Sequence, residues 1–223
     1  MKKVVIIVSV IIILLSIGVG VYYFVTKEKT DNIKFKEEYE ALNGESIYGK
    51  KVLSIDIDED NLMKYATFDE IMDVLESGTG IIYFGFPECP WCRNAVPSII
   101  KAAKEMEIEN IYYFNAYEIR DIKELKDGKI VTTKEGTKEY YKLIEALGDF
   151  VGPYDGLEDE SIKRLYFPTM VFVMGGKIVG SHEGTVESQE DPYKTLSKQQ
   201  EKELVKIYKD YINKIYGTCD ESC

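Results

Sequence analysis

Two cysteines separated by two residues are the part of this sequence best suited to chemistry. Cys89 and Cys92 enclose Pro90 and Trp91 in the stretch CPWC. A thiol becomes a nucleophile when it is deprotonated, and two thiols at this spacing can also bond to each other. The pair can therefore exchange electrons with a disulfide, because Cys89 can attack it and Cys92 can then resolve the mixed disulfide.

A zinc site and a structural disulfide are the other roles open to such a pair. Zinc needs two further ligands, and the sequence offers only Cys219 and Cys223 in a Gly-flanked tail and a single histidine, His182. A disulfide between Cys89 and Cys92 would close a very small loop and constrain the unfolded chain little. We therefore expect redox exchange, with no metal and no other cofactor.

A buried strand followed by a helix is predicted to position the two sulfurs. The apolar run at residues 80–86 is typical of a central parallel strand, and a helical period follows from Pro90 to about Met106. Proline suits the first helical position, so Cys89 should lie at the helix start and Cys92 one turn inside.

Charged groups near the pair act in opposite directions. The free N–H groups and the dipole at a helix start favour a thiolate, and Arg93 adds a positive charge. Glu88, directly before Cys89, works against the thiolate.

A long insertion, Tyr117–Leu165, interrupts the fold. It is predicted to form a helical cap that shapes the substrate site.

The remaining patterns indicate an α/β domain. Helices separate the first strands, which implies parallel pairing through right-handed crossovers, and Gly175-Gly176 marks a terminal hairpin with antiparallel strands. The other expected elements are strands at 51–57 and 110–116, a helix at 67–78, and a last helix that starts near Ser197.

The N-terminus predicts a membrane anchor. Residues 4–25 carry no charge and as a helix would extend about 33 Å, enough to cross a bilayer. Residues 1–3 should then lie in the cytoplasm, 26–49 form a charged stalk, and 50–217 form the domain outside, followed by the tail 218–223. A cleaved signal peptide is the alternative.

The net charge of −11 argues against a nucleic-acid partner, because binding to phosphates needs a basic surface.

Several motifs together resemble the thioredoxin superfamily. CPWC matches its active-site motif, Pro97 stands where that family bends the active-site helix, and Phe167-Pro168-Thr169 matches its cis-proline loop. The resemblance implies a thioredoxin-like fold, a three-layer α/β/α arrangement with a mixed sheet, here with a helical insertion and one preceding transmembrane helix. It implies a cis Phe167–Pro168 bond facing Cys89, and substrate contacts from Pro90, Trp91, Phe167, Pro168 and Thr169.

The chain is most similar to membrane-anchored thioredoxin-like proteins exported by Gram-positive bacteria, such as the bacteriocin-transport accessory type. We therefore expect an extracytoplasmic thiol–disulfide oxidoreductase whose partners are exported cysteine-containing proteins or peptides and a membrane redox partner. The alternative is an accessory module that binds an exported peptide with no essential redox turnover. Cys219 and Cys223 are expected to form a second, local disulfide, or else a relay to Cys89.

The chain also departs from that family. Glu88 replaces a tryptophan before the first cysteine, Tyr83 stands where cytoplasmic thioredoxins have a buried acid, and the interval from Cys92 to Pro168 is long. These differences leave open whether the protein oxidises, reduces or isomerises disulfides.

Overall fold

The computed structural model describes residues 29–47 and 49–217. The predicted membrane segment at 4–25 and the tail with Cys219 and Cys223 lie outside the described residues. No helix of the described part is long and apolar enough to cross a membrane. The chain divides into two units, and the sheet, the helices and the cysteine pair belong to the second, which begins at Asp31.

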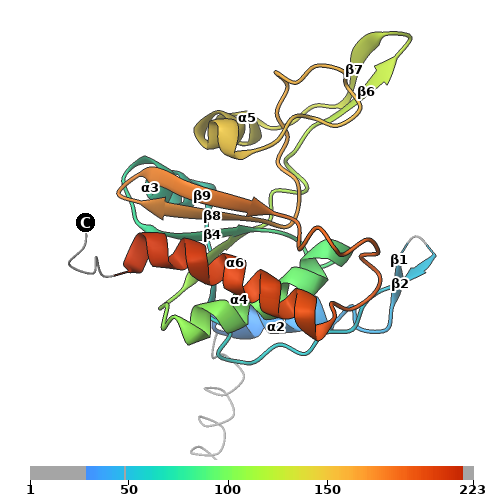
Figure 1. The fold of residues 1–223 in the computed structure, drawn as a ribbon. Coiled ribbons are helices and arrows are strands. Elements are labelled where there is room, and N and C mark those ends of the chain that lie inside the picture. The colour runs from blue at the N-terminus through green and yellow to red at the C-terminus, as the bar shows by residue number, and fades with distance from the viewer. Residues whose placement is uncertain (1–28, 48, 218–223) are drawn as a thin grey trace, which may run out of the picture. The chain divides into compact units, whose positions relative to one another are not determined.

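A mixed five-stranded sheet forms the centre of the domain (Figure 1). β3, β5 and β4 pair in parallel, whereas β4–β8 and β8–β9 are antiparallel. The predicted α/β class with a mixed sheet is confirmed. In sheet order the strands are β3 (Met63–Tyr65), β5 (Ile111–Phe114), β4 (Gly80–Phe84), β8 (Thr169–Met174) and β9 (Lys177–Glu183).

Helices cover both faces of this sheet (Figure 1). One face packs against α2 (Asp31–Glu40), α4 (Pro90–Glu105) and α6 (Lys198–Tyr216), and the other against α3 (Phe68–Glu76) and α5 (Lys138–Leu147). The central strand β4 is buried along its whole length because Ile81 and Tyr83 join the first core while Ile82 and Phe84 join the second. An uninterrupted apolar run is the sequence pattern that such a strand requires.

Local signals fix where these elements begin and turn. Thr67 caps α3 in a reciprocal capping box with Glu70, and Cys89 is the N-cap of α4 with Pro90 in its first turn. Gly175 and Gly176 have φ angles of 57° and 73° and form the turn between β8 and β9, a conformation that glycine adopts without a steric penalty. These boundaries agree with the sequence predictions.

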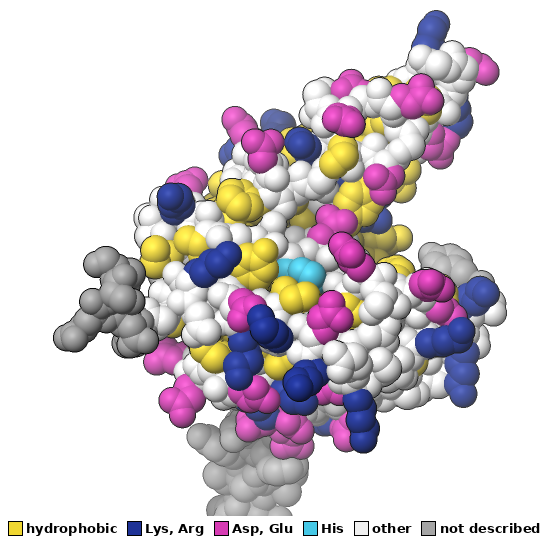
Figure 2. Space-filling model, in the orientation of Figure 1, with side chains coloured by type: hydrophobic (Ala, Val, Ile, Leu, Met, Phe, Trp, Pro, Cys, Tyr) yellow, Lys and Arg dark blue, Asp and Glu magenta, His cyan; other side chains and the backbone are white. Residues whose placement is uncertain are grey.

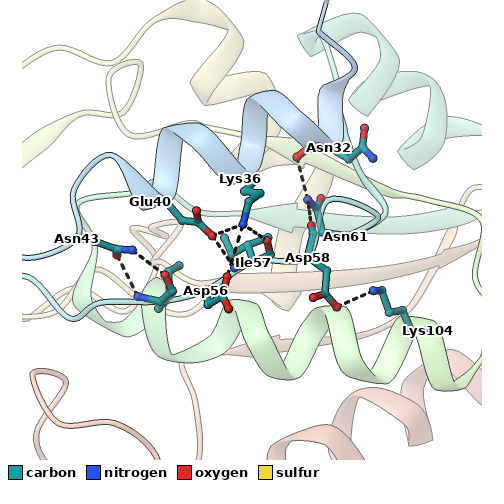
Figure 3. A network of polar contacts seen from close by, with 10 residues as sticks. Asn32, Lys36, Glu40, Asn43, Asp56, Ile57, Asp58, Asn61 and Lys104 are labelled. Atoms are coloured by element: carbon teal, nitrogen blue, oxygen red, sulfur yellow. Dashed lines mark hydrogen bonds and ion pairs between the residues drawn. The ribbon is translucent and has the colours of Figure 1, made fainter.

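The predicted stalk is wrong for residues 31–49, since α2 belongs to the domain core. Phe35 and Tyr39 are fully buried. Figure 3 shows the polar network that holds α2 against the segment before β3: Lys36 donates to the carbonyl of Ile57 at 2.5 Å, and the Ile57 N–H donates to Glu40 at 2.7 Å. The domain therefore starts at Asp31 rather than at residue 50.

The predicted first strand at 51–57 is also wrong. Only its start is paired, in a small hairpin of β1 (Ser46–Ile47) and β2 (Lys50–Lys51). Beyond it, the backbone N–H and carbonyl of Ile55 both bond to the side chain of Asn43, at 3.0 and 2.7 Å. The segment is therefore held by residues following α2 instead of by a strand of the sheet, whose edge is β3.

The insertion at 117–165 is only partly helical, which corrects the predicted helical cap. It begins with a separate hairpin, β6 (Ile122–Lys126) and β7 (Lys129–Lys134), which extends away from the five-stranded sheet in Figure 1. The hairpin is followed by α5 and a 3₁₀ turn, η1 (Gly148–Phe150). Asp127 and Gly128 have φ angles of 50° and 71°, the combination required by a tight hairpin turn.

The hairpin surface is not covered by the rest of the domain. Ile122, Ile130 and Val131 are each about two-fifths exposed. In Figure 2 hydrophobic side chains lie on this hairpin between charged ones.

Candidate functional site

Cys89 and Cys92 occupy the start of α4 as predicted, and Cys89 is the more exposed of the two. Cys89 Sγ accepts a hydrogen bond from the Cys92 N–H at 3.1 Å. Cys89 is 5% exposed and Cys92 is 0% exposed, and both are free thiols. The helix continues past the exposed Pro97 to Glu105. Cys89 is thus the sulfur that a partner can reach, and Cys92 is enclosed beneath it.

The cis-proline loop faces Cys89 across this site. The Phe167–Pro168 bond is cis, as expected, and the Cys89 thiol lies 3.6 Å from the carbonyl oxygen of Phe167. The two segments meet because Thr169, the first residue of β8, pairs with Phe84, the last residue of β4. Antiparallel pairing of these strands therefore determines the distance between parts of the chain that are far apart in sequence.

Arg93 has a different role from the one predicted. Its guanidinium is buried and donates to the carbonyls of Leu53, Tyr39 and Pro87 at 2.6, 2.8 and 3.1 Å, and to Asn43 Oδ1 at 2.6 Å. Burial lowers the pKa of Arg93. The side chain ties the loop before Cys89 to the end of α2, and its donors are directed at oxygen atoms instead of at the Cys89 sulfur.

Tyrosines surround the inner thiol. Burial raises the pKa of Cys92, and the neighbouring Cys89 sulfur raises it further. Hydrogen bonding from the backbone of Phe86 and from the Tyr83 hydroxyl acts in the opposite direction. The Tyr83 hydroxyl also lies 3.1 Å from the hydroxyl of Tyr39, so a pair of phenols occupies the place beneath Cys92.

A cleft of about 500 Å³ opens beside the outer sulfur. Its wall includes Cys89 and Pro90, together with residues of the β1–β2 arm, the segment after β5, the cis-proline loop and the segment before α6. Trp91 is half-buried but does not line the cleft. A volume of about 500 Å³ is large enough for a side chain or a short peptide segment next to the reacting sulfur.

Four residues form one wall of this cleft, and we call them the aromatic–arginine cluster. They are Phe86, Tyr117, Arg120 and Phe167. Sequence reasoning singled out Phe167 but missed the other three as site residues. The available signal was the position of Tyr117 and Arg120 just beyond the carboxyl end of β5, since ligand-binding residues gather at that edge of parallel strands.

No group of three or more His, Cys, Asp or Glu side chains within residues 29–47 and 49–217 is placed to hold a metal ion. Comparison of the chain with protein-family models, with curated proteins and with solved structures finds no match.

Proposed function

We propose that this protein is a thiol–disulfide oxidoreductase that acts on the cysteines of other proteins through Cys89 and Cys92. The observation that carries the proposal is the placement of Cys89. It caps a helix, accepts the Cys92 N–H, and lies 3.6 Å from the Phe167 carbonyl next to an open cleft. A helix start complements negative charge on such a sulfur.

The reaction follows from the order of the two sulfurs. The Cys89 thiolate attacks one sulfur of a substrate disulfide, whose S–S bond breaks, and the departing substrate thiolate takes up a proton. Cys92 then loses its proton and attacks the Cys89 sulfur, releasing the second substrate thiolate and forming the Cys89–Cys92 disulfide. Two electrons pass to the substrate, and the reverse sequence donates a disulfide to a dithiol.

The buried position of Cys92 separates the two steps. Because burial raises the pKa of this thiol, Cys92 remains protonated while Cys89 reacts first. The Tyr83 hydroxyl is the side-chain group that favours the Cys92 thiolate. In this proposal the Tyr83 hydroxyl assists the resolving step by stabilising the Cys92 thiolate.

A thioredoxin-like fold, anchored by residues 4–25 with its domain outside the cytoplasm, fits this chemistry. The mixed sheet, the helix beginning at the cysteine pair and the adjacent cis-proline loop support the fold. Disulfides persist in an exported compartment. The partners would be exported cysteine-containing proteins and a membrane redox protein that resets the pair.

Turnover on protein disulfides tests the proposal against the alternative of a binding module with idle cysteines. The full chain should accelerate both the reduction of insulin by a dithiol and the refolding of reduced ribonuclease in a glutathione buffer. Cys89→Ser and Cys92→Ser should each abolish multiple turnover while retaining the unfolding midpoint of the wild type. Equal rates for the wild type and both variants would leave only the binding role.

A further inference from the structure

The aromatic–arginine cluster holds a planar cation close to the reacting sulfur. The Arg120 guanidinium lies 5.0 Å from the ring centres of both Tyr117 and Phe167. Phe86 stacks on Tyr117 at 4.3 Å and meets Phe167 edge-on at 5.4 Å. Because the Phe167 carbonyl also contacts Cys89, the same residue links the cation to the thiol. Stacking of this kind restricts the orientation of a guanidinium group.

Arg120 has no carboxylate partner within the described part of the chain. Its one hydrogen bond runs to the carbonyl of Leu165 at 3.4 Å. Of the two acidic residues that line the cleft, Glu118 lies 3.9 Å from Lys134, and Glu88 interacts with the buried Arg93. The nearby acids are thus already opposed by other cations.

Lys50 adds a second cation to the lining of the cleft. Its ammonium lies 5.7 Å from the centre of the Tyr193 ring and also attracts the carboxylate of Asp191. Arg164 does not line the cleft: its guanidinium lies 4.1 Å from the ring centre of Tyr154 and 5.7 Å from that of Tyr166, and its pKa is lowered first by burial and then by the charge of Arg120. In a protein with a net charge of −11, the cleft beside Cys89 thus combines aromatic walls with the guanidinium of Arg120 and the ammonium of Lys50.

The geometry points to a substrate class: disulfides that carry a carboxylate close to the reacting sulfur, with Arg120 as the specificity-determining residue. This inference rests on the proposed function. A carboxylate can accept two parallel hydrogen bonds from a guanidinium group, and stacking on Tyr117 and Phe167 restricts the orientation of this one. In the exchange step Cys89 bonds to one substrate sulfur, and the other sulfur leaves as a thiolate that takes up a proton.

Two aromatic disulfides of different charge provide the test with the reduced full chain. Dithiobis(nitrobenzoate) is a dianion and dithiodipyridine is neutral, so the ratio of their rate constants isolates the effect of charge. Arg120→Gln should lower this ratio about tenfold relative to wild type, the scale of local electrostatic attraction in a cleft. Arg120→Lys should retain most of it. Lys126→Gln, which makes the same change in net charge on the distant hairpin β6–β7, should leave the ratio unchanged.

The outcomes separate the inference from the function on which it rests. If Arg120→Gln leaves the ratio at the wild-type value, or if Lys126→Gln lowers it equally, the substrate class is overturned while the exchange activity stands. If the wild type reacts with neither disulfide faster than free cysteine does, the proposed function itself fails. A ratio that falls only in Arg120→Gln, and whose difference from wild type disappears at high salt, supports the inference.

Discussion

The hydroxyls of Tyr39 and Tyr83 lie 3.1 Å apart, which places a phenol pair from helix α2 and strand β4 beneath the inner thiol. Both side chains are fully buried, and burial raises the pKa of each. Neither phenol ionises at neutral pH, so the pair acts on Cys92 as a hydrogen-bonding group and not as a base.

Replacement of Tyr83 by phenylalanine should slow the resolving step. The Tyr83 hydroxyl lowers the pKa of Cys92, so its removal raises that pKa and reduces the thiolate population at neutral pH. We expect about tenfold slower resolution, with the pH–rate profile displaced to higher pH. Single-turnover decay of a mixed disulfide measures this rate. An unchanged profile in Tyr83→Phe, despite a native fold, would remove the hydroxyl from the mechanism.

Helix α2 should contribute strongly to the free energy of unfolding, because it belongs to the domain core and not to a stalk. Phe35 is fully buried in the core, so Phe35→Ala should cost about 3–5 kcal/mol of unfolding free energy. Lys34→Ala, one residue away and exposed, is the matched control and should cost less than about 0.5 kcal/mol. Urea unfolding measures both. Similar small costs for both variants would mean that α2 is an appendage.

Some boundaries of the helices and strands could be predicted because they depend on short local sequence signals. The helix start at Cys89–Pro90, the capping of α3 by Thr67 and the Gly175–Gly176 turn each follow from rules that depend on few neighbours. The hairpin β6–β7 was missed although Asp127–Gly128 between alternating residues is its standard signal. The two strands give a weak apolar signal, because most residues of β6 are charged and β7 contributes only Ile130 and Val131.

Other features depend on packing that no local pattern shows. α2 has a mostly charged sequence, and only Phe35 and Tyr39 indicate a buried face. Arginine is almost never fully buried without partners, so the burial of Arg93 could not be inferred before its carbonyl partners were known. The stacking of Arg120 on Phe167, a residue far along the chain, is a further contact that no local pattern shows.

Arg93 should contribute more to stability than to exchange chemistry. Its four hydrogen bonds reach oxygens on three segments, and Arg93→Met would remove all four of these bonds, including those to the carbonyls of Leu53 and Pro87. We expect a loss of about 3 kcal/mol or more in unfolding free energy. Denaturant titration measures the loss, and a cost under about 1 kcal/mol would contradict this role.

His182 should make the stability depend on mildly acidic pH. Its Nε2 donates to the Thr185 carbonyl at 2.8 Å, but burial dominates and lowers the pKa of the imidazole. The unfolded chain therefore binds a proton more readily than the folded chain, and stability falls as the pH drops below about 6.5. His182→Gln keeps a donor without titration, so its urea midpoint should fall less than that of wild type between about pH 7 and pH 5. Parallel decreases in both proteins would exclude His182 as the cause.

Trapping of the mixed disulfide tests the central claim most directly. The Cys92→Ala variant of the full chain is incubated with a protein disulfide, and the linked peptides are identified by mass spectrometry. Because Cys89 is the outer sulfur and Cys92 is fully enclosed, we predict a stable adduct at Cys89 in Cys92→Ala and none at Cys92 in Cys89→Ala. Absence of any adduct at Cys89, or equal adduct formation by both variants, would contradict the account.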